Sequence, residues 1–168
     1  MTLQEIKRLI AFNSWATHRV FEALSELSAE EFTRDMKASH SNIHGTLTHL
    51  VGAEKIWLSR MAGTPDKAMI KPPDVPTLPD VKRTWEETGF NMAKFLGTMT
   101  DRKLQETFAF TASTGQQLVQ VYADALQHVI DHSTFHRGQV IVLMRQMGHT
   151  PPATGMIGFF RETSKPRK

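Results

Sequence analysis

The sequence predicts an all-α protein, a four-helix bundle with one long crossover connection, formed by residues 1–168 as a single domain. Four stretches carry apolar residues at helical spacing, and each is long enough to form an amphipathic helix. Between the second and third of them, residues 63–79 hold five of the eight prolines, which cannot continue a helix and indicate a long connection. Four amphipathic helices joined in this way bury their apolar faces most simply as a bundle.

The first three long helices are predicted from capping residues and apolar spacing. Thr2 begins a capping box, and the apolar stripe behind it continues to Leu27. Ser28 begins a second capping box, which predicts a short helical turn. Apolar residues then recur from about 41 to 61, which predicts the second long helix. Thr77-Leu-Pro-Asp80 restarts the chain after the connection, and the apolar stripe from Val81 to Met99 predicts the third long helix.

The second half of the chain contains a short alternating segment and the longest helical stripe. Phe108 and Phe110 alternate with small or polar residues within 104–120, which indicates a loose β-hairpin. The fourth long helix is predicted over 122–147, and Gly148 ends it.

The composition excludes several classes of site and partner. The chain has no cysteine, so any metal must be bound by histidine or carboxylate. The formal net charge is only +3, and no basic face interleaved with aromatic residues is visible, so we expect no nucleic-acid partner. No apolar run approaches the roughly 18–20 residues that cross a bilayer, and the N-terminus lacks the features of a signal peptide. We therefore expect a cytoplasmic protein with no membrane partner.

Histidines interrupt the apolar stripe of the fourth predicted helix. His132 and His136 fall near the middle of that stripe, whereas His128 lies at its edge. His128 and His136 would be about 12 Å apart along the helix axis, too far for one ion whose bonds to nitrogen are roughly 2.0–2.1 Å long. A third ligand must then come from another helix, and His49 is the natural candidate because it flanks the stripe of the second long helix. These three residues predict a site for one divalent transition metal.

Alternatives remain open for these and other polar residues. Two core histidines satisfied by hydrogen bonds would give the same pattern as His132 and His136. A second pair, His40 and His44, lies at the polar start of the second long helix and is expected to be solvated. Asn13 and Glu54 interrupt apolar stripes, and each could orient a ligand histidine or form a hydrogen bond between helices in the core. Gly138 within the fourth long helix indicates a close helix crossing.

Several segments resemble one known family of metalloproteins. Residues 128–155 read HVIDHSTFHRGQVIVLMRQMGHTPPATG and resemble the signature of the DinB/YfiT-like family, in which a His-x3-His-Arg-Gly segment on the last long helix supplies two metal ligands. Three more segments resemble the family's early Asn-x-Trp segment, its first ligand segment and its glycine-containing stretch: FNSWATHRV, GTLTHLVGAEKIWLSRM and TASTGQQ. The similarity covers nearly the whole chain. One departure is Gly155, which stands where the family often has an aspartate.

The resemblance implies a metal bound by His49, His132 and His136, the same set that the apolar stripes predict. We expect zinc or nickel, with iron or manganese as alternatives. Three imidazoles leave at least one coordination position open, as in catalytic sites. The family includes S-transferases that depend on low-molecular-weight thiols. The resemblance therefore implies a metal-dependent transferase that acts with a small thiol on a small electrophilic substrate, and no catalytic residue beyond the ligands is identified.

Two other functions remain open at this point. A metal-bound hydroxide would make the protein a hydrolase, with Glu54 as a candidate base. A purely structural, sensing or storage metal would make it a non-catalytic helical protein. The family also implies a homodimer, and Phe159 and Phe160, beyond the last long predicted helix, add aromatic surface that favours one. The alternative is that the C-terminal segment folds back over the chain's own helices and covers those rings.

Overall fold

The computed structural model describes residues 1–64, 66 and 68–164, and these form a mostly helical protein with one small sheet. The elements in chain order are α1 (Leu3–Leu24), α2 (Ala29–Thr33), α3 (Ile43–Met61), the 3-10 helix η1 (Pro72–Asp74), α4 (Leu78–Gly97), α5 (Asp101–Leu104), β1 (Thr107–Thr111), β2 (Gln117–Val121), α6 (Tyr122–Gln146) and α7 (Met156–Thr163).

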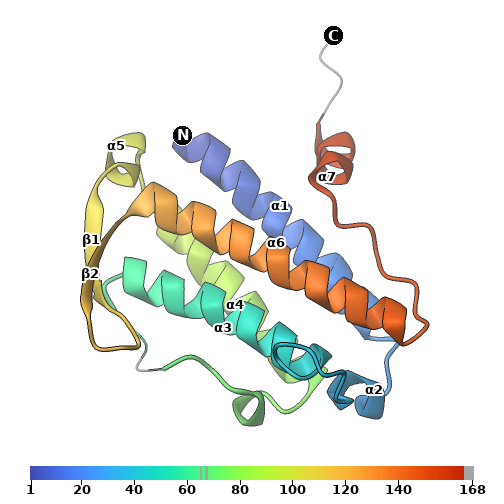
Figure 1. Ribbon diagram of the computed structural model, residues 1–168. Helices are drawn as coiled ribbons and strands as arrows, with labels where there is room; N and C mark the ends of the chain where they lie inside the picture. The colour runs from blue at the N-terminus through green and yellow to red at the C-terminus, as the bar shows by residue number, and fades with distance from the viewer. Residues whose placement is uncertain (65, 67, 165–168) are drawn as a thin grey trace.

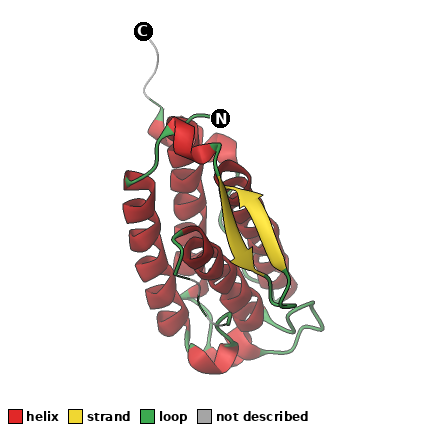
Figure 2. Cartoon of the chain, turned by 90° about the vertical axis from the view of Figure 1, so that its left-hand side faces the viewer, coloured by secondary structure: helices red, strands yellow, loops and turns green. Residues whose placement is uncertain are grey.

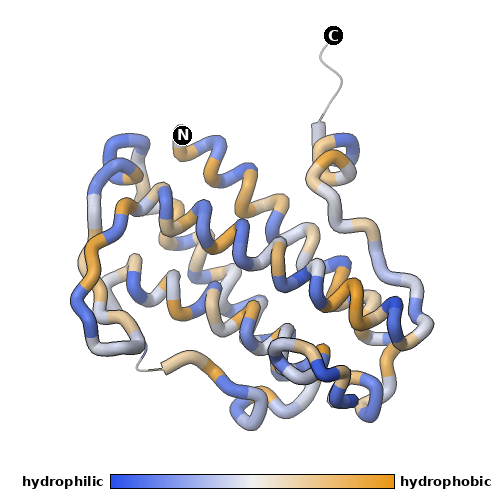
Figure 3. Tube along the Cα trace, viewed as in Figure 1, coloured by the Kyte–Doolittle hydropathy of each residue, from blue (hydrophilic) through white to orange (hydrophobic). Residues whose placement is uncertain are grey.

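The four long helices α1, α3, α4 and α6 lie side by side (Figure 1). Both α1 and α3 contact α4 and α6, so each long helix touches at least two others and their apolar faces meet in one interior. Hydrophilic and hydrophobic residues alternate along these helices (Figure 3), as expected for elements with one face in the core and one in solvent.

Capping residues fix where the helices begin, as the sequence predicts. Thr2, Ser28 and Thr77 each form a complete capping box at the N-terminus of α1, α2 and α4. The start of α3 is capped by Asn42, whose side-chain oxygen accepts a hydrogen bond from the Gly45 N–H at 2.7 Å. These side chains satisfy N–H groups that have no partner within their own helix.

The interior between the long helices is mostly apolar. Val20 and Leu24 of α1 lie with Leu47 and Leu50 of α3 in one cluster, and all four are fully buried. Each such leucine stabilises the fold by about 1.5–3 kcal/mol relative to an exposed one. The helical stripes therefore account for most of the core.

The predicted hairpin is confirmed, and it lies against one end of the helices. β1 and β2 pair antiparallel, with Phe108 opposite Gln120. Phe108 is buried, and the ring of Phe110 packs edge-on against Trp57 of α3 with the ring centroids 5.3 Å apart. Figure 2 shows the hairpin lying alongside the helices.

The structure decides two open points about the second half of the chain. The C-terminal segment folds back over α1 as α7, and Phe159 is buried against Phe12 and Trp15. The Phe159 ring is therefore covered by its own chain and offers no surface to a partner. A close helix crossing at Gly138 is also wrong, because a Cβ built there meets no atom within 4 Å.

Within the described residues, every helix is too short or too polar to pass through a lipid bilayer.

Candidate metal centre

The three predicted ligands come together between α3 and α6. His49 lies on α3, whereas His132 and His136 lie one turn apart on α6. The ring centroids are 5.0 Å apart for His49 and His132, 4.6 Å for His49 and His136, and 4.3 Å for His132 and His136. His128 is exposed, and its ring packs against Trp57. This agrees with its predicted place at the edge of the apolar stripe.

A fourth histidine joins the group, although the sequence pattern placed it in solvent. His40 lies on the loop between α2 and α3, and its ring stacks on that of His49 with the centroids 4.1 Å apart. His40, His49 and His136 each offer a ligand atom within 4.8 Å of the other two. His40 was missed because its sequence neighbours are polar and the path of a loop is not encoded in helical periodicity.

His44 is also not solvated as expected. It is buried, and its Nε2 lies 2.8 Å from the carbonyl oxygen of Val75. Its ring packs on Phe32 of α2. The connection between α3 and α4 covers this part of α3, and nothing in the local sequence around His44 indicates that cover.

Two sets of imidazole nitrogens approach the spacing of metal ligands: His49 with His132, and His40 with His49 and His136. His49 Nε2 and His132 Nε2 are 3.1 Å apart. Two nitrogens that bind one tetrahedral ion at roughly 2.0–2.1 Å are about 3.3 Å apart. The ligand nitrogens of His40, His49 and His136 lie within 4.8 Å of one another, so small side-chain movements would bring them around such an ion. Imidazole nitrogens suit zinc, nickel, copper and iron.

The hydrogen bonds of the cluster leave lone pairs directed into it. His136 Nδ1 lies 2.8 Å from Gln139 Oε1, so Nδ1 donates the hydrogen and Nε2 keeps its lone pair. Gln139 also reaches Ser39, beside His40, with Nε2 donating to Oγ at 3.4 Å. Within the described residues the buried Nδ1 of His132 has no hydrogen-bond partner. The contact between His49 Nε2 and His132 Nε2 therefore leaves the other ring nitrogen of His132 without a hydrogen bond.

The protein environment favours neutral imidazoles. Burial, together with the charges of His40 and His136, lowers the pKa of His49 to about 4. Burial likewise lowers the pKa of His132 to about 4, and the charge of His136 is the next cause. Burial also lowers the pKa of His136, against the opposite effect of its bond to Gln139. Only the neutral ring binds a metal, so the unliganded cluster is already in the binding form near neutral pH.

Asn13 and Glu54 form hydrogen bonds between helices in the core. Glu54 Oε1 accepts from Asn13 Nδ2 and from Ser133 Oγ, each at 2.7 Å. Arg137 donates to Asn13 Oδ1, and to Thr17 Oγ1 at 3.1 Å. Burial raises the pKa of Glu54, while these hydrogen bonds and the Arg137 charge oppose the shift. Among the described residues, none of the bonds made by Glu54 reaches a histidine, so it is not the partner that orients a ligand.

Two cavities lie next to the histidine cluster. A cavity of about 290 Å³ is lined by His40 and His49, with Met69 and Ile70 on its other wall. A groove of about 580 Å³ runs between the loop that carries His40 and the face of α6 that presents Phe135. The Phe135 ring also packs on His136. The first cavity therefore gives a small molecule access to the cluster, whereas the lining of the groove includes none of the four histidines.

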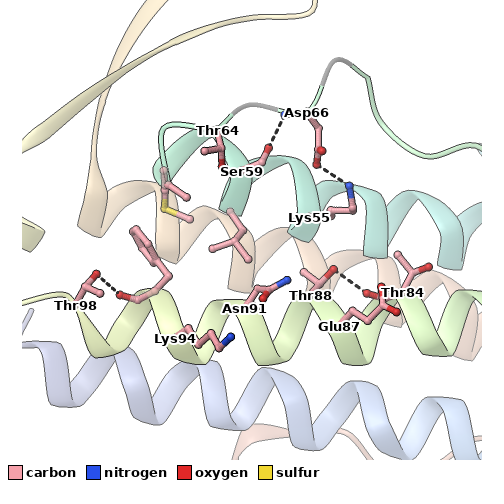
Figure 4. Close-up of a pocket in the computed structure, with 14 residues that line it drawn as sticks. Lys55, Ser59, Thr64, Asp66, Thr84, Glu87, Thr88, Asn91, Lys94 and Thr98 are labelled. Atoms are coloured by element: carbon pink, nitrogen blue, oxygen red, sulfur yellow. Dashed lines mark hydrogen bonds and ion pairs between the residues drawn. The ribbon is translucent and has the colours of Figure 1, made fainter.

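A third hollow, of about 590 Å³, lies between α3 and α4 and shares no residue with the histidine cluster (Figure 4). Its polar lining includes Lys55, whose Nζ lies 2.7 Å from Asp66 Oδ2. Ser59 Oγ accepts a hydrogen bond from the backbone N–H of Asp66 at 3.1 Å. The hollow holds no group of metal-binding imidazoles, so the histidine cluster is the better candidate for chemistry.

Comparisons with known proteins show the family of the chain. The sequence model of the DinB family matches residues 2–167. The chain is 24% identical to Protein DinB of Bacillus subtilis (strain 168), over 94% of this chain and 96% of that protein. It is 26% identical to the uncharacterized protein YizA of the same organism, over 90% of this chain and 93% of that one.

The crystal structure of a DinB-like protein from Bacillus cereus ATCC 10987 has a similar fold. The TM-score is 0.59 at 24% sequence identity, over 83% of this chain and 92% of that one. The likeness extends to the overall arrangement of the helices.

Proposed function

The chain belongs to the DinB family, and we propose that it is a metal-dependent enzyme whose divalent transition metal is held by His49, His132 and His136. The observation that carries this proposal is the approach of His49 Nε2 to within 3.1 Å of His132 Nε2 across two helices. Burial lowers the pKa of His49, His132 and His136, and the ring of His40 stacks on that of His49. Zinc or nickel is the metal we propose, with iron or manganese as alternatives.

The reaction we propose is transfer of a small thiol to a small electrophilic substrate. The metal would supply Lewis-acid activation of the thiol or of water. Among the chain's own residues, Gln139 fixes the tautomer and orientation of His136. The 290 Å³ cavity, which His40 and His49 line, suits a small thiol.

A non-catalytic metal site is the second candidate, because His40 brings a fourth imidazole to the cluster. Four protein ligands would give the closed coordination of structural sites. Hydrolysis has less support, because the carboxylate of Glu54 is already engaged by Asn13 and Ser133 and is not available to the cluster as a base.

We also propose that α1, α3, α4 and α6 form a four-helix bundle with a long crossover connection between α3 and α4. The contacts that join α1 and α3 to both α4 and α6 support this assignment.

A thiol-transfer assay tests the function. The protein is loaded with zinc or nickel and incubated with small thiols and 1-chloro-2,4-dinitrobenzene, and the thioether product is followed by absorbance. We expect product formation that requires both metal and thiol, and that is lost in His132→Ala. Ester cleavage without any thiol would support the hydrolase instead. A fully loaded protein that turns over neither kind of substrate would support the non-catalytic site.

A further inference from the structure

The loop between α2 and α3, residues 34–42, holds His40 against the proposed ligands. The His40 ring is nearly parallel to that of His49, with an interplanar angle of 20°, and its centroid lies 5.3 Å from that of His136. Within the described residues the His40 ring makes no hydrogen bond. The His40 ring therefore contacts the rings of His49 and His136, in the position of a further metal ligand.

The backbone of this loop is shaped to keep His40 in that position. Lys37 and Ser41 both have positive φ, at 55° and 66°, a conformation that non-glycine residues adopt only where the surrounding structure enforces it. The His40 carbonyl accepts a hydrogen bond from Asn42 N at 2.8 Å. The same carbonyl lies directly over Gly45, where any Cβ would clash with it. Gly45, in the first turn of α3, therefore stands where the backbone of the loop comes closest to that helix.

The His40 side chain nevertheless has room to leave. It is only partly buried, and it lines the 290 Å³ cavity together with Ser41 and His49. The groove on the other side of the loop is lined by residues 36–39. A long hydrogen bond joins this part of the loop to α6, in which Gln139 Nε2 donates to Ser39 Oγ at 3.4 Å. Rotation of the His40 ring into the cavity breaks no buried hydrogen bond.

We propose that His40 is a fourth, exchangeable metal ligand, which fills the open coordination position in the resting protein and leaves it when a small exogenous ligand binds. This inference rests on the metal site of the proposed function. It reconciles the two candidate functions, since the same site is closed at rest and open when a thiol is present. An incoming ligand must compete with His40, so its apparent affinity is reduced by the fraction of protein in which His40 is bound.

Cobalt(II) binding tests the proposal, because the visible spectrum of cobalt reports its coordination. The full-length wild-type protein, His40→Ala and His40→Gln are titrated with cobalt, and then with 2-mercaptoethanol. We expect both variants to bind cobalt on the order of tenfold more weakly. Their visible spectra should show that water has replaced the His40 imidazole as a cobalt ligand. We also expect them to bind 2-mercaptoethanol several-fold more tightly than the wild type, because no histidine has to be displaced.

The matched control is His18→Ala, which removes an exposed histidine that pairs with Glu22 on α1. It should leave cobalt affinity, spectrum and thiol affinity unchanged. A wild-type protein that binds no cobalt would refute the metal site itself. Wild-type binding with an identical spectrum and affinity in the His40 variants would refute the role of His40 alone. Complete loss of cobalt from variants whose circular dichroism is unchanged would make His40 an obligatory ligand and overturn its exchange.

Discussion

Burial of the histidines links their protonation to the stability of the metal-free protein. His49 and His132 have a pKa of about 4 in the folded state, against about 6.5 in an unfolded chain. Between these values the unfolded chain binds more protons than the folded one, so acid favours unfolding. The stabilising effect of the neutral rings is complete above pH 6.5 and is lost as the pH falls toward 4.

We therefore predict that the free energy of unfolding of the metal-free protein decreases as the pH is lowered from about 6.5 to about 4. Urea denaturation at a series of pH values measures it. The double variant His49→Ala, His132→Ala should show a flatter profile over that range. An equally steep profile in the double variant would show that other groups cause the acid sensitivity.

Arg137 is a second residue whose burial has a measurable consequence. Its side chain is almost fully buried, and burial lowers its pKa to about 10 while the Glu54 charge acts in the opposite direction. Arg137→Met would leave the Glu54 carboxyl without its compensating charge and Asn13 without its donor. We predict a loss of about 3–5 kcal/mol in the free energy of unfolding, measured by urea denaturation.

Arg145→Met is the matched control, because this arginine lies exposed on the last turn of the same helix. It should change the stability by less than about 0.5 kcal/mol. A loss below 1 kcal/mol for Arg137→Met would mean that the buried polar cluster is not important for stability.

At the scale of elements, helical periodicity and capping residues were sufficient to predict the four long helices. Thr2 and Thr77 mark helix starts because each provides a side-chain acceptor and a carboxylate three residues later. The stripes also predicted that His132 and His136 face α3, because residues four apart share a helix face. The short helices α5 and α7 were not predicted, since a segment of four to eight residues has too few positions to show a period.

Loops are where prediction from the sequence fails, and His40 shows why. Its position depends on positive φ at Ser41 and on the glycine at the start of α3, neither of which is a pattern of hydrophobicity. We predict that Gly45→Ala forces the loop away from α3, costs about 1–3 kcal/mol in the free energy of unfolding, and weakens metal binding by displacing His40. Thermal unfolding and cobalt titration measure the two effects.

Gly138→Ala is the internal comparison for that substitution. Gly138 lies within α6 and has open space where a Cβ would be. Replacement by alanine should therefore stabilise the protein by about 0.5–1 kcal/mol through its better helix propensity. Equal behaviour of the two alanine variants would contradict the close approach of the loop to Gly45.

At the scale of the whole molecule, the expected homodimer stays a prediction, but the residues that favour it change. Phe159 is covered by α1, whereas Phe135 and Val142 of α6 remain 64% and 51% exposed. Exposed apolar side chains of this size are enriched at interfaces. We predict a mass in light scattering of about twice the 19.0 kDa of the chain, and a shift toward the monomer in Phe135→Glu. A monomeric wild type at micromolar concentration would contradict the dimer.

The central claim is that two helices and their histidines form one metal site, and elemental analysis of the purified protein tests it most directly. We predict close to one divalent transition metal per chain. Replacement of His49, His132 or His136 by alanine should each strip most of that metal, whereas alanine at the exposed His128 should retain it. A protein that loses its metal with His128→Ala but keeps it with His136→Ala would contradict the account.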